Sequence, residues 1–180
     1  MKRREFLTSS LAAGVAFGFP ALVSARSPNA KVCHACIGTH GMAGADMRTF
    51  AGFKDILDVV AVCDVDVAYL AEAKKLLPNA RVYRDWRELL AAEGDRIDAV
   101  NVSTPDHTHT IVSANAMRRG KHVYCQKPLC KKLDECRLLR RLAAETGVTT
   151  QLGTQFASGL GDRQIVAFLQ QGVIGPVTRV

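Results

Sequence analysis

The stretch IDAVNVSTPDHTHTIVSANAMRRGKHVYCQKPL, residues 97–129, decides the fold. It begins with an apolar run that predicts a strand buried on both faces. Pro105 ends this strand, because proline cannot donate to a strand ladder and pushes the preceding residue into extended geometry. A helix is predicted over 107–118, and a second strand at 122–125 leads into Gln-Lys-Pro at 126–128. Both strands therefore end in polar residues followed by proline, at the edge where open parallel sheets bind ligands.

Outside this stretch, apolar runs and helical periodicities alternate along the chain. Strands are predicted at 31–37, 59–63, 81–83, 97–102, 122–125 and 148–152, and helices at about 42–53, 67–77, 86–92, 107–118, 132–146 and 162–171. Strands that alternate with helices of this length are typical of βαβ units and a parallel sheet. The sequence therefore predicts an α/β fold with a doubly wound parallel sheet. A last strand is expected from Pro176, where the chain stops.

The first 25 residues, MKRREFLTSSLAAGVAFGFPALVSA, have the basic start, apolar middle and small-residue end of an export signal. Arg3 and Arg4, followed by one residue and then Phe-Leu, resemble the twin-arginine signal, and cleavage is expected after Ala25. We therefore expect residues 1–25 to be a signal peptide that engages the twin-arginine export machinery. The folded protein would then be periplasmic or otherwise extracytoplasmic. The alternative is an uncleaved membrane anchor.

The chain has 180 residues, 48% of them hydrophobic, which is typical of a globular protein with a real core. Its formal net charge is +7, with basic residues grouped at 118–121 and 131–141. Because no aromatic residues alternate with these charges, a solvated helix face is favoured over nucleic-acid binding, and no nucleic-acid partner is expected.

Six cysteines are present, and two of them, Cys33 and Cys36, have CxxC spacing. Residues three apart on a strand face opposite ways, so these two sulfurs should diverge. Free, mostly buried thiols are therefore favoured over disulfides or a zinc site, and no metal centre is predicted.

The first predicted strand ends in a glycine-rich turn, GTHGMAG at residues 38–44. A turn that holds a dinucleotide needs glycine where the chain turns tightly, where the backbone approaches the pyrophosphate and where the helix packs on the strand. His40 departs from this pattern at the second position. Gly41 could shift the close approach by one residue, or His40 could hamper the phosphate, and an ordinary βα turn is a third interpretation. The candidate phosphate-binding residues are Gly38, His40, Gly41 and Met42.

Asp64 follows the second predicted strand, where an acid can accept hydrogen bonds from the adenosine ribose. A carboxylate there repels a 2′-phosphate, so NAD is expected as the cofactor in preference to NADP. The alternative is that Asp64 or Asp66 simply caps the next helix, a role that is expected of Asp66 in any case.

The runs TPDHTH at 104–109 and GKHVYCQKPL at 120–129 resemble, at this spacing, the glucose-fructose oxidoreductase / inositol dehydrogenase (Gfo/Idh/MocA) family. The hallmark of that family is Glu-Lys-Pro after the fifth strand, and Gln126 replaces the glutamate here. The resemblance covers residues 31–180. It implies an NAD(P)-binding Rossmann domain, here 31–153, followed at 154–180 by the truncated start of a second α/β domain. In the family that second domain carries most substrate contacts, and its sheet often forms homo-oligomers.

The resemblance also implies roles for single residues. Lys127 would be catalytic and would hydrogen-bond the reacting oxygen of the substrate beside the nicotinamide, while Gln126 would contact the nicotinamide ribose. His109 would pack or hydrogen-bond behind the site, and a cis bond is expected between Lys127 and Pro128. The remaining candidates for the cofactor site are Thr104, Pro105, His107 and Gln155.

These features together predict an exported NAD-dependent oxidoreductase that acts on CH–OH groups. Hydride would pass between the nicotinamide and a secondary alcohol of a small sugar or polyol. Two alternatives stay open. An NAD-dependent glycosidase of the same family would oxidise its sugar only transiently and release no net NADH. A non-catalytic, truncated nucleotide-binding module is favoured by His40 in the phosphate turn and by the shortness of the second-domain segment.

Overall fold

The computed structural model describes residues 30–176 and 178–179, where strands and helices alternate as the sequence predicts. The strands are β1 (Val32–Ile37), β2 (Leu57–Cys63), β3 (Arg81–Tyr83), β4 (Ala99–Val102), β5 (His122–Gln126) and β6 (Thr150–Gly153). The helices are α2 (Met42–Gly52), α3 (Val67–Leu76), α4 (Trp86–Glu93), α5 (Asp106–Arg118), α6 (Leu133–Thr146), the short 3-10 helix η1 (Gln155–Ser158) and α7 (Leu160–Gln170). The signal peptide predicted at residues 1–25 lies outside the described residues.

The strands form one parallel sheet in the order β3-β2-β1-β4-β5-β6. The central strand β1 lies between β2 and β4, so the chain builds one half of the sheet, returns to the centre and builds the other half. This is the strand order of the doubly wound Rossmann fold, in which ligands bind at the carboxyl ends of the strands beside that reversal. The predicted fold class is confirmed.

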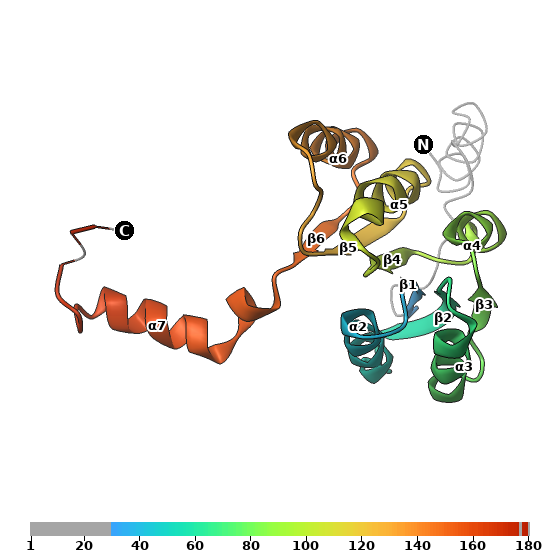
Figure 1. Ribbon diagram of the computed structural model, residues 1–180, viewed down its shortest axis with the longest axis horizontal. Helices are drawn as coiled ribbons and strands as arrows, with labels where there is room; N and C mark the ends of the chain where they lie inside the picture. Colours follow the sequence, from blue (N-terminus) through green and yellow to red (C-terminus); the bar gives the residue numbers. More distant parts are fainter. Residues whose placement is uncertain (1–29, 177, 180) are drawn as a thin grey trace, which may run out of the picture. The chain divides into compact units, whose positions relative to one another are not determined.

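Helices cover both faces of the sheet, and each face has its own apolar core (Figure 1). On one face, Met47 of α2 and Leu70 of α3 pack against Cys36 and Val62. The core of the other face includes side chains of α4, α5 and α6, namely Leu89, Leu90, Val112, Met117, Leu139 and Leu142. The prediction that β4 is buried on both faces is confirmed, because Val100, Asn101 and Val102 are each 0% exposed.

The last helix differs from the others in its burial. None of the residues described in α7 is buried, and exposed apolar side chains lie along it at Leu160, Ile165, Val166, Phe168 and Leu169. The strand expected from Pro176 is not formed at Pro176, Thr178 or Arg179, where no strand pairing supplies ladder hydrogen bonds. Over the described ranges, no helix is both long enough and apolar enough to cross a membrane.

Candidate functional site

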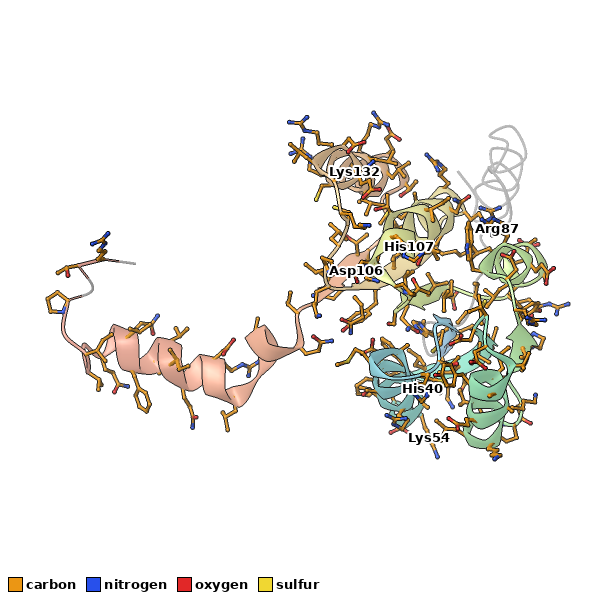
Figure 2. The ribbon with its side chains drawn as sticks, in the orientation of Figure 1. His40, Lys54, Arg87, Asp106, His107 and Lys132 are labelled. Carbon is orange, nitrogen blue, oxygen red and sulfur yellow. The ribbon has the colours of Figure 1, made fainter. Side chains whose placement is uncertain are left out.

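A cleft of about 740 Å³ lies at the carboxyl edge of the sheet, where the sequence predicts the site. The predicted site residues that line it are Gly38, His40, Asp64, Thr104, Pro105 and His107. Gly41 borders instead a second hollow of about 390 Å³ beside Thr39 and His40. Figure 2 shows His107 at the start of α5 and His40 near α2, the two helices that follow the strands at the centre of the sheet. Four other predicted residues are not among the residues lining either hollow: Met42, Gln126, Lys127 and Gln155.

The turn between β1 and α2 has the backbone geometry of a phosphate-binding turn. Gly38 has a φ of 97°, and a Cβ at this position would lie 2.5 Å from the carbonyl oxygen of Ser103. Only glycine therefore fits there. Gly41 has a φ of 59° and is the N-cap of α2, where no side chain caps the first amides of the helix. Uncapped amides at a helix N-terminus favour anions such as a pyrophosphate, so the turn fits the predicted cofactor.

His40, which replaces the second glycine of the usual turn, is held by the neighbouring helix α3. Its ring stacks on Tyr69 with the centroids 3.9 Å apart and the planes 6° from parallel. Its Nδ1 lies 3.8 Å from Oε2 of Glu72, also on α3. Gly41, one residue after His40, has a positive φ.

Asp64 ties the glycine turn to the end of β2. Its Oδ2 accepts hydrogen bonds of 2.9 Å from both the backbone N–H and the hydroxyl of Thr39. Its Oδ1 accepts a third, of 3.1 Å, from the backbone N–H of Asp66. A carboxylate offers about four acceptor positions, so one remains for a ribose hydroxyl in this arrangement. Asp66 is the N-cap of α3 and accepts from the N–H of Ala68, as predicted.

The end of β3 also lines the cleft, which the sequence analysis missed. Arg84, Asp85, Trp86 and Arg87 follow this strand and border the cleft, as does Tyr69. The guanidinium of Arg87 lies over the ring of Trp86, 4.5 Å from its centroid. Nη1 of Arg87 also lies 3.2 Å from both carboxylate oxygens of Asp85. Ligands bind at the carboxyl ends of the strands of such a sheet, and this rule placed Asp64 and Thr104 in the site. Applied to the end of β3, the same rule would have predicted that residues 84–87 line the site.

A hydrogen-bonded network of buried and partly buried polar side chains connects α2 with three strands. Oδ2 of Asp46 accepts hydrogen bonds from Ser103 Oγ at 2.7 Å and from Gln126 Nε2 at 2.8 Å. Asn101 donates to Ser103 Oγ at 3.0 Å, and Nε2 of His34 lies 3.0 Å from Oδ1 of Asn101. Burial lowers the pKa of His34 to about 4 against the opposing hydrogen bond of Asn101, so His34 is neutral at pH 7. Nε2–H of His34 is then the donor to Asn101.

Asp46 is the one carboxylate in this hydrogen-bonded network, and the sequence analysis did not predict its role. A signal for it exists in the sequence, because Asp46 lies between Ala43 and Met47 on the face of α2 that packs on the sheet. A carboxylate on an apolar helix face requires hydrogen-bond donors from elsewhere in the fold.

Both polar atoms of the Gln126 side chain form hydrogen bonds within the protein. Its Nε2 donates to Asp46, and its Oε1 accepts a 3.2 Å hydrogen bond from the backbone N–H of Lys127. Gln126 is only 4% exposed, whereas Lys127, the predicted catalytic residue, is exposed. The bond between Lys127 and Pro128 is cis, as predicted. Gln155 follows β6, and its buried Nε2 has no partner among the described residues.

His109 joins the two loops that contain the motif prolines. Its Nε2 lies 2.7 Å from the carbonyl oxygen of Thr104, and its Nδ1 lies 2.6 Å from that of Pro128. Carbonyl oxygens only accept, so both ring nitrogens must donate, which requires the protonated imidazolium. Burial alone lowers the pKa of His109, but hydrogen bonds with Cys125, Pro128 and Thr104 raise it to about 9. His109 thus hydrogen-bonds behind the site, one of the two roles expected of it.

Residues 32–154 match the model of the GFO_IDH_MocA family, an oxidoreductase family with an NAD-binding Rossmann fold. The chain is 33% identical over 131 residues to an inositol 2-dehydrogenase of Burkholderia multivorans, covering 72% of this chain and 37% of that protein. It is 34% identical over 137 residues to a glycosyl hydrolase family 109 protein of Stenotrophomonas maltophilia, covering 70% of this chain and 29% of that protein.

Among solved structures, the fold matches that of scyllo-inositol dehydrogenase from Lactobacillus casei with bound NAD(H) and scyllo-inositol, with a TM-score of 0.74 at 23% identity. That match covers 83% of this chain and 44% of the other. The chain therefore spans less than half the length of each of these three proteins. Because the family model matches more than half of the chain and the strand order agrees with it, this chain belongs to the Gfo/Idh/MocA family of oxidoreductases, and its Rossmann domain binds NAD.

Proposed function

We propose that this chain is the cofactor-binding part of an NAD-dependent oxidoreductase that moves hydride between the nicotinamide and a secondary alcohol of a sugar or polyol. The observation that carries the proposal is the cleft between the glycine turn and the loop at Thr104 to His107. His109 ties that loop to the cis Lys127–Pro128 segment. The names of the inositol dehydrogenases among the relatives support a polyol as the substrate class.

NAD supplies the carbon that accepts or donates the hydride, and the protein supplies binding and proton transfer. The uncapped amides of α2 bind the phosphates, and the free acceptor position of Asp64 binds a hydroxyl of the adenosine ribose. Lys127, which is exposed beside the cis bond, donates a hydrogen bond to the substrate oxygen and takes up or returns its proton.

We propose NAD rather than NADP because of the charges around the cleft. Asp64 would repel a 2′-phosphate, and its carboxylate is fixed in place by Thr39. Arg84 and Arg87 line the same cleft at the end of β3, and Asp85 between them pairs with Arg87 and offsets part of this positive charge.

Calorimetric titration of the purified chain with NAD and then NADP tests the cofactor assignment. We expect NAD to bind more tightly, and we expect Asp64→Ala to lose that preference. Asp58→Ala is the matched control, because Asp58 lies on β2, the strand that Asp64 follows, but pairs with Lys31 on the surface. Equal affinity of the unmodified chain for both dinucleotides would contradict the role of Asp64.

An NAD-dependent glycosidase is the second candidate, and the 34% identity to a glycosyl hydrolase family 109 protein favours it. Such an enzyme regenerates its NAD within each turnover. Incubation with NAD and a polyol or glycoside separates the two functions: net NADH without bond cleavage supports the dehydrogenase, and glycosidic cleavage without net NADH supports the glycosidase.

We also propose export by the twin-arginine route to the periplasm or another extracytoplasmic site, on the strength of Arg3-Arg4-Glu5-Phe6-Leu7. Replacement of both arginines by lysine is expected to retain the protein in the cytoplasm. Fractionation of cells that express the two forms measures this, and unchanged export of the lysine form would contradict the proposal.

A further inference from the structure

Two thiols, Cys130 and Cys136, lie together where the Lys127–Pro128 segment enters α6. The Cys130 Sγ lies 3.4 Å from the carbonyl oxygen of Lys132, and the backbone N–H of Cys136 donates to the same oxygen at 3.2 Å. Figure 2 labels Lys132 at the start of α6, where this shared carbonyl lies. The Cys130 thiol and the backbone of Cys136 therefore meet at one carbonyl oxygen, which brings the two cysteines close together in the folded chain.

The exposure of this pair distinguishes it from three of the other four cysteines. Cys36, Cys63 and Cys125 are buried, so the expectation of mostly buried thiols holds only for these three. Cys130 and Cys136 are both partly exposed, because they lie on a loop and on the first turns of a helix rather than inside the sheet. Small oxidants in solution can therefore reach them.

The segment between the two cysteines is already held in place. Oε2 of Glu135 accepts hydrogen bonds from the backbone N–H groups of Lys131 at 2.9 Å and Lys132 at 3.1 Å. These bonds fix the loop against the first turn of α6. Little further ordering of the backbone is then needed to join the two sulfur atoms.

We propose that Cys130 and Cys136 are a site of intramolecular disulfide formation, with a small-molecule disulfide such as oxidised glutathione as the oxidant. One thiolate attacks a sulfur atom of the oxidant, which forms a mixed disulfide and releases one glutathione thiol. The second cysteine then displaces the other glutathione and forms the protein disulfide. Two protein thiols lose two electrons and two protons, and the oxidant is reduced to two thiols.

The surroundings of the pair affect the rate of the first step. Burial, with the neighbouring Cys136 and Glu135, raises the pKa of the Cys130 thiol. Since the thiolate is the nucleophile, disulfide formation is expected to be faster at alkaline pH than at neutral pH. The finished bond would tie the loop that follows the cis Lys127–Pro128 segment to α6.

The test uses the whole reduced chain, incubated with oxidised glutathione at neutral pH, digested with trypsin and analysed by mass spectrometry. The expected product has lost two hydrogen atoms and contains a crosslink between peptides 122–131 and 133–137. Peptide 122–131 also contains Cys125, so fragmentation of the crosslinked peptides is used to assign the bond to Cys130. Cys33→Ser is the matched control, because Cys33 is another partly exposed cysteine and its loss should leave the crosslink intact. Cys130→Ser should stop at a glutathione adduct on Cys136.

Several results would overturn the proposal. Recovery of both cysteines as thiols, two separate glutathione adducts on the unmodified chain, or a crosslink to any other cysteine would each do so. Oxidation in denaturant shows whether the fold selects the pair, because the unfolded chain should give mixed products from all six thiols. Circular dichroism of the serine variants establishes that they are folded. The measurement is independent of NAD binding, so its outcome is separate from that of the proposed function.

Discussion

Asp46 and Gln126 are separated by 80 residues in sequence and share a buried hydrogen bond, in which Nε2 of Gln126 donates to Oδ2 of Asp46 over 2.8 Å. Gln126 stands where the family motif has glutamate. A glutamate at this position would place a second carboxylate against Asp46, and two carboxylates that share a buried site repel each other. The amide of Gln126 therefore complements the carboxylate of Asp46.

Gln126→Glu is expected to destabilise the chain at neutral pH by about 2 kcal/mol or more, since a favourable hydrogen bond becomes a like-charge contact. The variant should recover stability as the pH falls, because the shared site raises the pKa of one carboxylate and that carboxylate then takes up a proton. Denaturant unfolding at about pH 5 and about pH 8 measures the change.

A second substitution provides the control for this prediction. Asp46→Asn in the Gln126→Glu background supplies an amide opposite the new carboxylate and should restore most of the lost stability. The coupling free energy between the two substitutions is then large and favourable. A Gln126→Glu variant as stable as the original chain at both pH values would show that the contact is unimportant.

The alternation of strands with helices and most of the cleft were predictable because they depend on local patterns. Apolar runs define the strands, and Pro105 and Gly38 mark where two of them end, so the residues that follow could be placed at one edge. Asp64 and His107 were located in this way. The prediction was incomplete where the same rule was not extended to β3, which left out Arg84 and its neighbours.

Other features depend on contacts that no local pattern contains. The partners of Asp46 come from the ends of two different strands, and a single sequence does not show which donors a buried carboxylate meets. Likewise, His40 could be recognised as a departure from the glycine pattern, but its stacking on Tyr69 depends on the packing of α3 beside the turn. Tertiary contacts of this kind are visible only in the folded chain.

His109 is expected to make the stability of the chain pH-dependent. Its pKa is about 9 in the folded chain, compared with about 6.5 in an unfolded one. A raised folded pKa contributes stability that is fully present below about pH 6.5 and is lost as the pH rises through about 9. In the His109→Gln variant, the melting temperature should depend less on pH between about pH 6.5 and about pH 9. His107→Gln is the matched control, since His107 is exposed on the same helix, and an identical profile for both variants would contradict the prediction.

Gly38→Ala is expected to destabilise the chain by about 2–4 kcal/mol and to reduce NAD binding, because the residue has a positive φ and its Cβ would meet the carbonyl oxygen of Ser103. Gly52→Ala is the control within the next helix. Nothing lies within 4 Å of a Cβ at Gly52, so that change should stabilise the helix by about 0.5–1 kcal/mol. Thermal unfolding of the two variants compares them, and equal melting temperatures would refute the steric argument.

An ion pair between the buried Glu93 and the partly exposed Arg81 joins α4 to β3. Glu93 is 0% exposed and accepts hydrogen bonds from the guanidinium of Arg81 and the hydroxyl of Tyr83. The hydrogen bond from Arg81 lowers the pKa of Glu93, so this stability is present near neutral pH and is lost as the pH falls through that lowered pKa. Glu93→Gln should cost about 1–3 kcal/mol at neutral pH. Glu88→Gln, at an exposed position of the same helix, should cost less than about 0.5 kcal/mol in the same unfolding assay.

The position of the His40 side chain determines whether the phosphates of NAD can reach the turn between β1 and α2. Because its ring is stacked on Tyr69 and lies near Glu72, we expect it to leave the amides of α2 accessible. His40→Gly should then change the dissociation constant for NAD by less than about threefold. Tyr69→Ala removes the ring that holds the imidazole, and it should weaken binding more than His40→Gly does. Calorimetric titration measures both, and a gain of about tenfold or more in His40→Gly would mean instead that the imidazole obstructs the phosphate.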